Sequence, residues 1–131
     1  MAQVSRRPLD EKQWQMMWVR LVNLVAEDMD LPEAEVVLEG LLTETERVML
    51  TKRLMAGVLL NSGWSVPKVA LVLKLSTASV YKFKLVLEKD KKFKRFVEER
   101  FPEMVEKPAR DASVKELEKL VEKYFKGLYG I

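Results

Sequence analysis

The basic and hydroxyl side chains of residues 64–95 have the greatest potential for chemistry in this sequence. The stretch carries nine Lys and Arg residues against two Asp and Glu residues, a net charge of +7, whereas the whole chain of 131 residues has +3. A hydroxyl cluster, Ser76-Thr77-Ala78-Ser79, is followed by Tyr81 and by lysines on both sides of Phe83. A concentrated basic patch is the electrostatic footprint of a surface that binds phosphates. These residues therefore favour binding of a polyanion.

Side chains that perform catalysis or bind metals are scarce. The sequence contains no Cys and no His. Thiolate zinc sites, cysteine nucleophiles, and the commonest general base and metal ligand are therefore excluded. The 20 Asp and Glu residues are spread over segments of helical period, where carboxylates usually form a solvated helix face. We expect no catalytic residue, no metal and no cofactor, and an enzyme is the least favoured class.

The composition favours an all-α fold. Hydrophobic residues make up 48% of the sequence, enough for a core, and the 5 Gly and 5 Pro residues lie far apart, which suits long helices with short connections. No run approaches the roughly 20 apolar residues of a membrane span. Residues 1–12 lack the apolar segment of a secretory signal. We expect a soluble, cytoplasmic protein without a membrane partner.

Two short helices joined by a three-residue connection are predicted around the hydroxyl cluster. Ser65 is a favourable N-cap for the first helix, residues 66–73, and Pro67 lies in its first turn, where the missing N–H would be unpaired anyway. Residues 74–76 form the connection. Lys74 stands there in place of the glycine common in such turns, so we expect it to adopt a positive φ. Ser76 is a favourable N-cap for the second helix.

The second helix, residues 77–88, has two chemically different sides. Val80, Phe83 and Leu87 recur at steps of three and four and are predicted to face the core. The residues predicted to face outward are Thr77, Tyr81, Lys82 and Lys84. Two such helices form the helix-turn-helix, whose second helix enters the major groove of DNA. The alternative is an ordinary corner of two helices with solvated lysines, but the basic charge favours the helix-turn-helix.

The remaining chain is also predicted to be helical. The expected segments are residues 10–28, 32–42, 43–60, 90–101 and 113–131. Capping boxes are predicted where Asp10, Thr43 and Ser113 begin three of these helices. The buried side of residues 43–60 is predicted to consist of Val48, Leu50, Leu54, Val58 and Leu59. Residues 102–112, with Pro at both 102 and 108, are predicted to be a linker to the C-terminal amphipathic helix. The apolar stripe of that helix is predicted to consist of Val114, Leu117, Val121, Tyr124 and Leu128, with Leu120 and Phe125 beside them.

The predicted helix at residues 10–28 carries a broad apolar stripe. Trp14, Trp18, Leu21 and Val25 recur at steps of three and four. Two tryptophans on one side of a helix are too much apolar surface to leave in water. The residues alone leave open whether this stripe packs inside the chain or forms a dimer interface.

The order of these parts resembles the Trp repressor family. The segment "LLTETERVMLTKRL", residues 41–54, precedes the two short helices of "SVPKVALVLKLSTASVYKFK". Family members read leucine-threonine-x-x-glutamate-arginine, then a long helix, then a helix-turn-helix with serine or threonine at the start of the recognition helix. The matching residues are Leu42, Thr43, Glu46, Arg47, Leu50, Arg53, Ser65, Leu73, Ala78 and Val80. The resemblance extends over residues 10–88.

This resemblance implies an all-helical, intertwined homodimer whose N-terminal helices interlock. Trp14, Trp18, Leu21 and Val25 would then form the dimer interface. The two recognition helices of the dimer would lie about 34–36 Å apart, one turn of DNA, on a palindromic site. A Trp repressor-like domain would cover residues 1–101, with the helix-turn-helix at 65–88.

The sequence departs from the family where its tryptophan-binding member holds the indole. That member uses two arginines, the second followed by glycine. Arg53 matches the first arginine, Lys82 replaces the second, and Phe83 replaces the glycine. A lysine lacks the planar fork of arginine, and a phenylalanine is large enough to fill the space of the indole. We therefore expect that the protein does not respond to tryptophan.

The leading prediction is a homodimeric, sequence-specific regulator of transcription that binds double-stranded DNA. Thr77, Ala78, Tyr81 and Lys82 are the predicted base contacts. The predicted phosphate contacts are Lys68, Lys84, Lys89, Lys91, Lys92 and Lys94. The full predicted DNA-binding set is Ser65, Lys68, Ser76, Thr77, Ala78, Ser79, Tyr81, Lys82, Lys84, Lys89, Lys91 and Lys92. Two alternatives are a protein-interaction module, whose partner would bind the C-terminal helix, and a DNA-binding subunit of a promoter-recognition or recombination system.

Overall fold

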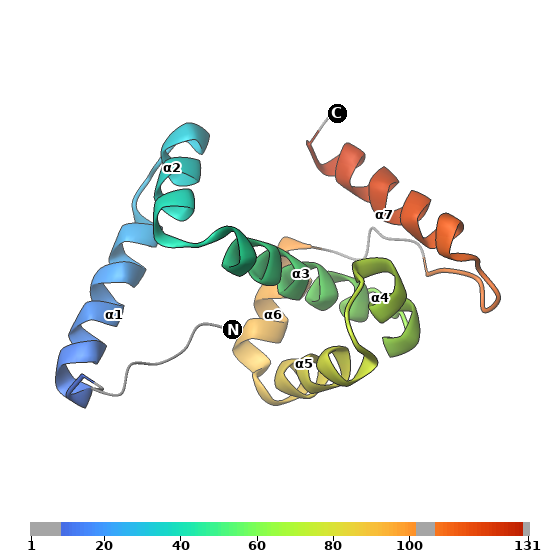
Figure 1. Cartoon of the computed structure of the whole chain (residues 1–131), viewed down its shortest axis with the longest axis horizontal. Coiled ribbons are helices and arrows are strands. Elements are labelled where there is room, and N and C mark those ends of the chain that lie inside the picture. Colours follow the sequence, from blue (N-terminus) through green and yellow to red (C-terminus); the bar gives the residue numbers. More distant parts are fainter. Residues whose placement is uncertain (1–8, 102–106, 130–131) are drawn as a thin grey trace. The chain divides into compact units, whose positions relative to one another are not determined.

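The computed structural model describes residues 9–101 and 107–129, and the side chains of these residues up to Lys123. The helices are α1 (Glu11–Ala26), α2 (Leu31–Leu41), α3 (Glu44–Asn61), α4 (Val66–Leu73), α5 (Thr77–Lys89), α6 (Lys91–Arg100) and α7 (Val114–Tyr129) (Figure 1). No strand occurs in these two ranges, so the all-α prediction is confirmed. The chain divides within α3 into two compact units, residues 1–49 and 50–131.

Helix starts in the first unit are fixed by local hydrogen bonds. The Thr43 N–H donates to the Glu46 carboxylate at 2.9 Å and the Glu46 N–H donates to the Thr43 hydroxyl at 3.1 Å, which confirms the capping box. Asp30 caps α2, because its carboxylate accepts from the Glu33 N–H at 2.9 Å. The predicted side-chain cap of α1 is wrong. Asp10 makes no capping hydrogen bond through its exposed side chain, and only its carbonyl accepts, from the Trp14 N–H.

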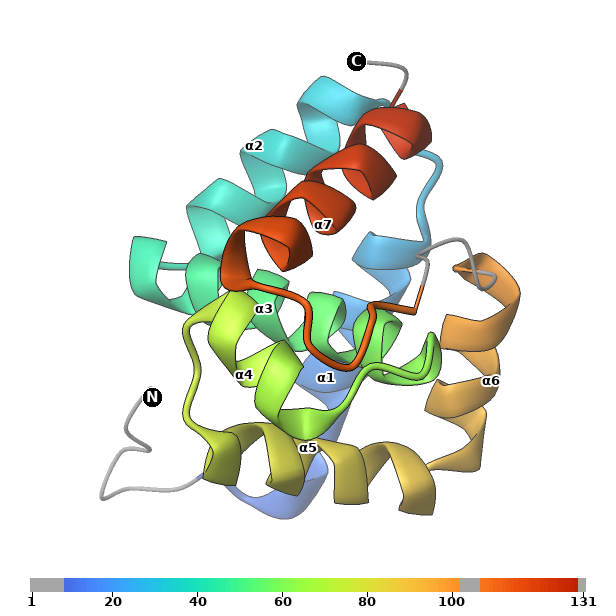
Figure 2. The ribbon, with the colours of Figure 1, turned by 90° about the vertical axis from the view of Figure 1, so that its right-hand side faces the viewer.

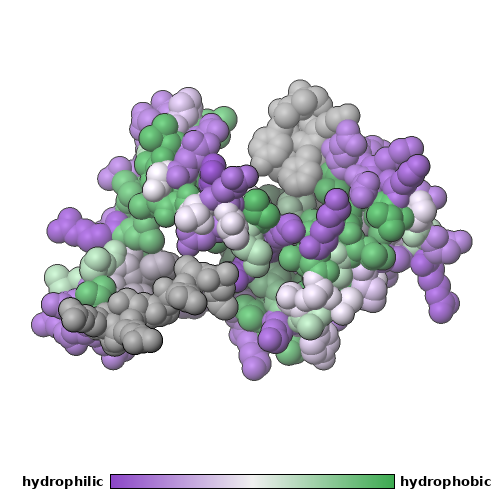
Figure 3. Space-filling view, in the orientation of Figure 1, coloured by the Kyte–Doolittle hydropathy of each residue, from purple (hydrophilic) through white to green (hydrophobic). Residues whose placement is uncertain are grey.

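Neither α1 nor α2 has a buried residue. Trp14 is 48% exposed and Trp18 is 54% exposed, and hydrophobic residues lie on the surface over α2 in Figure 3. The exposed apolar side chains of the two helices include Met16, Met17, Val19, Leu21, Val22, Val25, Leu31, Val36, Leu38 and Leu41. Burial of such surface is the main favourable contribution to folding. Among the described residues of the first unit, these two helices therefore have no buried core.

The second unit has a well-defined core. Its buried hydrophobic residues are Ala56, Val58, Leu59, Trp64, Val69, Ala70, Val80, Leu87, Val97 and Leu117. In Figure 2, α4 lies between α5 and α7, and it contacts both, while α5 also contacts α6. The core thus joins α5 to the rest of this unit through α4, α6 and the C-terminal half of α3.

The predicted buried side of residues 43–60 is only half correct. Val58 and Leu59 are buried, whereas Val48, Leu50 and Leu54 are exposed. Leu59 and its buried neighbours lie in the last turns of α3, where α3 enters the core cluster. A periodic apolar stripe predicts which side of a helix can be buried, and the length of helix that is covered depends on its partners.

The C-terminal segment packs closely in the second unit. Leu117 is buried, and Leu120 and Val121 lie against the same core cluster, as the apolar stripe of this helix predicts. The Glu116 N–H donates to the Ser113 hydroxyl at 3.3 Å. Within the predicted linker, Pro108 is buried, and residues 102–106 lie outside the described residues. Val114, the first residue of the predicted stripe, is exposed, so the prediction is wrong there. The stripe residues Tyr124, Phe125 and Leu128 have side chains outside the described residues.

Candidate nucleic-acid interface

The predicted pair of helices around the hydroxyl cluster is confirmed, and hydrogen bonds fix the connection between them. Ser65 caps α4 by accepting from the Lys68 N–H at 3.4 Å, and Ser76 caps α5 by accepting from the Ser79 N–H at 3.0 Å. The Ser76 and Ser79 hydroxyls are also hydrogen-bonded, at 2.8 Å. As predicted, Lys74 adopts the left-handed conformation, with φ 55° and ψ 51°. The start of α5 is therefore defined by its own side chains.

The connection is also held by a residue of α3. The Lys52 ammonium donates to the Lys74 carbonyl at 3.3 Å, at the C-terminal end of α4. A cation at this end of a helix interacts favourably with the helix dipole and with its last carbonyls. Lys52 was not among the predicted site residues, because nothing local in the sequence relates it to a turn 22 residues away.

The two sides of α5 separate as the sequence predicts. Val80 and Leu87 are buried, and Phe83 packs against the core with its ring edge-to-face to Phe93, the centroids 6.3 Å apart. The prediction that Phe83 is a core residue is confirmed. The exposed polar residues of α5 include Thr77, Ser79, Tyr81, Lys82 and Lys84, and Ala78, Leu85 and Val86 are exposed apolar residues of the same helix. The exposed surface of α5 is therefore polar and basic, with apolar side chains among the lysines.

The basic face continues from α5 into α6 with one intervening residue. Lys89 ends α5 and Lys91 begins α6, and between them the Asp90 carboxylate accepts from the Phe93 N–H at 3.0 Å. The exposed cations of this region are Lys82, Lys84, Lys89, Lys91, Lys92, Lys94 and Arg95. Asp90 therefore acts as the N-cap of α6. Among the described residues, none of these lysines forms an ion pair with a carboxylate.

Most, but not all, of the predicted site residues are exposed on α5 and at the start of α6. They are Thr77, Ala78, Ser79, Tyr81, Lys82, Lys84, Lys89, Lys91 and Lys92. At 3.6 residues per turn, Lys84 points away from Lys82, so these residues do not form a single face. Ser65 and Lys68 belong to α4 instead. Lys68 differs from the other predicted site lysines within the described residues, because its ammonium is hydrogen-bonded to a carbonyl of the chain, that of Ala109, at 2.6 Å. Ser65 and Ser76 are both engaged as helix caps.

One enclosed space lies beside α5 and α6. A cavity of about 110 Å³ is lined by Gly57, Leu60, Asn61, Lys84, Leu87, Glu88, Lys94 and Val97, from α3, α5 and α6. The Phe83 ring lies next to Gly57, one of the lining residues, because a Cβ placed on Gly57 would be 3.4 Å from this ring. The cavity is smaller than the roughly 300–1,000 Å³ of ordinary ligand pockets.

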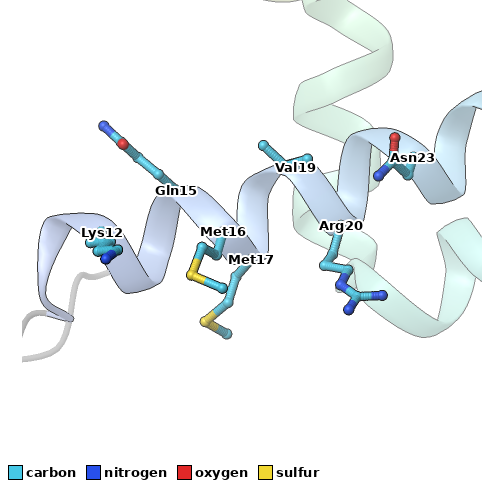
Figure 4. Close-up of a pocket in the computed structure, with 7 residues that line it drawn as sticks. All are labelled: Lys12, Gln15, Met16, Met17, Val19, Arg20 and Asn23. Atoms are coloured by element: carbon cyan, nitrogen blue, oxygen red, sulfur yellow. The ribbon is translucent and has the colours of Figure 1, made fainter.

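The predicted dimer-interface residues lie on one side of α1, and the opposite side is also apolar in part. Figure 4 shows the residues that line a shallow depression on α1, and all of them belong to this helix. They are Lys12, Gln15, Met16, Met17, Val19, Arg20 and Asn23. At 3.6 residues per turn, Met16 and Val19 point away from Trp14 and Trp18. A helix that is apolar around much of its circumference is typical of a buried element.

Comparison of the chain with protein-family models, with curated proteins and with solved structures found no significant match. Among the described residues, no helix combines the length and the apolar character needed to cross a membrane.

Proposed function

We propose that the protein is a homodimeric regulator of transcription, with a Trp repressor-like helix-turn-helix, that binds double-stranded DNA in a sequence-specific manner in the cytoplasm. The observation that carries the proposal is the exposed face of α5, which starts at a capped N-terminus after a three-residue turn. That face lies within the segment of net charge +7. A helix of this kind, backed by a core and surrounded by lysines, fits the major groove and its two phosphate walls.

The side chains of this face divide into two roles. Lys82 would donate to guanine, and the Ala78 methyl would contact the methyl of thymine, so these residues would read base edges together with Thr77 and Tyr81. Lysines such as Lys91 would bind phosphates and fix the register without reading sequence. The proposed phosphate contacts are Lys84, Lys89, Lys91, Lys92 and Lys94.

The exposed apolar surface of α1 and α2 supports the homodimer. Neither helix has a buried residue, although α1 alone carries Trp14 and Trp18. Helices that expose this much apolar surface are stabilised by association with another surface. A second copy of the chain would supply that surface and bring two α5 helices to one DNA site, with half-sites about 34–36 Å apart.

Tryptophan is not the proposed effector. Lys82, exposed on α5, stands where the resembling repressor has its second arginine, and the Phe83 ring fills the space next to Gly57. Isothermal titration with tryptophan is expected to give no heat of binding. Saturable binding would contradict this part of the proposal.

Selection of bound sequences from a random duplex pool tests the proposal directly. An inverted repeat is the expected result, because a symmetric dimer presents two identical reading helices. Enrichment of a single, non-repeated motif would contradict the dimer, and no enrichment over the starting pool would contradict sequence-specific recognition.

Substitution of single lysines then separates the two roles. On the selected duplex, Lys82→Ala is expected to weaken binding by about 1–3 kcal/mol and to relax specificity, with less effect on a random duplex. Lys91→Ala, which removes one phosphate contact from each chain of the dimer, is expected to weaken both duplexes alike and to reduce the salt slope by about 1.8. Lys119→Ala, which removes an exposed lysine from α7, is the matched control and is expected to change neither.

The second candidate function is a protein-interaction module. The C-terminal helix, predicted to bind the partner, buries Leu117 in the core, so the surface that favours this function is the exposed apolar surface of α1 instead. Sedimentation of Trp18→Glu distinguishes the two. A shift from dimer to monomer, with Arg20→Glu on the other side of α1 remaining dimeric, supports the homodimer. A wild-type chain that is monomeric at all concentrations, and that shows no salt-dependent DNA binding, favours the interaction module.

A further inference from the structure

The C-terminal segment, residues 107–123, contacts the first helix of the helix-turn-helix on the side away from α5. In Figure 2, α7 and the chain that leads to it lie along α4, and α5 lies beyond α4. Leu117 is 1% exposed and joins the core cluster that contains Val69 and Ala70 of α4 and Val80 of α5. Helix α4 is therefore held between the recognition helix and the C-terminal segment.

One polar contact ties the two parts together. The Lys68 ammonium, in the first turn of α4, donates to the Ala109 carbonyl at 2.6 Å, across 41 residues of sequence. Around this contact, Pro108 is buried, Ala112 packs against the core cluster, and the Lys107 stem lies 3.6 Å from a Cβ position on Gly63. The segment thus follows the surface from the end of α3 to the first turn of α4.

We propose that Lys68 is a positioning residue that fastens the C-terminal segment to α4, and that this segment is an integral part of the DNA-binding unit. The inference rests on the proposed function. It assigns Lys68 a different task from the other lysines of the basic segment, since Lys68 holds α4 in place while they contact phosphates.

The geometry explains how α4 can influence the reading helix. The Leu75 N–H donates to the Ala70 carbonyl at 3.0 Å, so the three-residue connection is bonded to α4 itself. Ala70 is 5% exposed and Val80 is 1% exposed, which leaves little room for α4 to move without moving α5. Interiors packed this densely transmit displacements instead of absorbing them. Loss of the contact on one side of α4 should therefore loosen α5 on the other.

Lys68→Met tests the role, because methionine keeps an apolar stem of similar length and removes only the donor and its charge. Binding is measured by fluorescence anisotropy at several salt concentrations, on the selected duplex and on a random duplex, at a temperature where circular dichroism shows the variant to be folded. Lys68→Met is expected to weaken binding to the selected duplex about three- to tenfold, in line with the loss of one hydrogen bond. The preference over the random duplex is expected to fall while the salt slope stays unchanged.

Lys68→Arg is the conservative variant and is expected to restore both affinity and preference, since arginine also donates to a carbonyl. Two outcomes would overturn the inference. A salt slope reduced by about 1.8 in the Lys68→Met dimer, about 0.9 for each chain, would make Lys68 a phosphate ligand. A lower melting temperature with unchanged affinity and preference would make the contact merely structural.

Amide hydrogen exchange on the same variants gives a result that does not depend on DNA. Lys68→Met is expected to speed exchange in α4 and in the first turn of α5, and Lys68→Arg is expected to exchange like the wild type. Unchanged exchange in α5 would overturn the inference. A wild-type chain that binds no duplex would instead refute the proposed function, and the exchange result would still decide whether Lys68 positions α4 and α5.

Discussion

Lys74 offers a sharp test of how the turn before α5 is built. It is an exposed non-glycine residue at φ 55°, where an L-residue brings its Cβ close to its backbone. This conformation costs an L-residue about 1–2 kcal/mol. Glycine adopts it without strain but loses about 0.5–1 kcal/mol more than other residues when its backbone is ordered. The difference predicts that Lys74→Gly stabilises the second unit by about 0.5–1 kcal/mol.

No interaction in the turn opposes this gain. The Lys52 ammonium bonds to the Lys74 carbonyl, and the Leu75 N–H bonds to the Ala70 carbonyl, so the contacts around the turn use only the main chain of residue 74. Both contacts remain when the side chain is removed. For a unit of this size, the predicted stabilisation corresponds to a rise in the melting temperature of about 2–8 °C.

The assay is urea and thermal unfolding of three proteins, followed by circular dichroism. Lys74→Ala is the matched control, because it removes the same charge and stem but keeps the strained φ, and it is expected to stay within about 0.5 kcal/mol of the wild type. A Lys74→Gly protein that is less stable than Lys74→Ala would refute the reasoning. It would mean that the left-handed conformation is not the main energetic feature of this turn.

Three further predictions concern the core and one helix cap. Leu59→Ala, at a fully buried residue of α3, is expected to lower the free energy of unfolding by about 2–5 kcal/mol, while Leu71→Ala, at an exposed residue of α4, changes it by less than about 0.5 kcal/mol in the same urea titrations. Gly57→Ala is expected to raise the free energy of unfolding by about 0.5–1 kcal/mol, because alanine is the better helix former. The new Cβ would lie 3.4 Å from the Phe83 ring, which is an ordinary contact distance. A loss of stability would mean that the Phe83 ring cannot adjust to the new methyl group. Hydrogen bonds with Thr43 hold the pKa of Glu46 below its ordinary value of 4.5. The bond with the Thr43 main chain has the larger effect, and the bond with the Thr43 side chain has the smaller one. The wild type is therefore expected to be more stable than Glu46→Gln above pH 4.5 and to lose this advantage as the pH falls, which a pH series of unfolding curves checks.

The parts of the fold that could be predicted from the sequence depend on neighbours three or four residues apart. Ser76 caps α5 through the N–H of Ser79, and Thr43 and Glu46 bond to each other, so residue type and spacing were sufficient. Asp10 shows the limit of this reasoning. It has a favourable type and position, but its side chain is exposed and makes no capping bond.

The contacts between distant segments could not be predicted in the same way. Lys52 bonds to the Lys74 carbonyl and Lys68 bonds to the Ala109 carbonyl, and both acceptors are main-chain groups, which every residue type offers. Periodicity predicts an apolar side for each helix but not the helix that will cover it. For this reason the inward direction of Phe83 was predictable, whereas the burial of Pro108 in the predicted linker was not.

The proposed dimer and the proposed phosphate contacts are linked through one measurable quantity. Each phosphate that a lysine neutralises contributes about −0.9 to the slope of log K against log salt. The five exposed lysines assigned to phosphates in one chain, Lys84, Lys89, Lys91, Lys92 and Lys94, would together give a slope of about −4.5, and two chains on one site about −9. A slope near −9 on the selected duplex requires both chains to place their basic segments on DNA at once. A slope near −4.5 means that only one chain engages its lysines, and the exposed apolar side of α1 then serves a purpose other than pairing two reading helices.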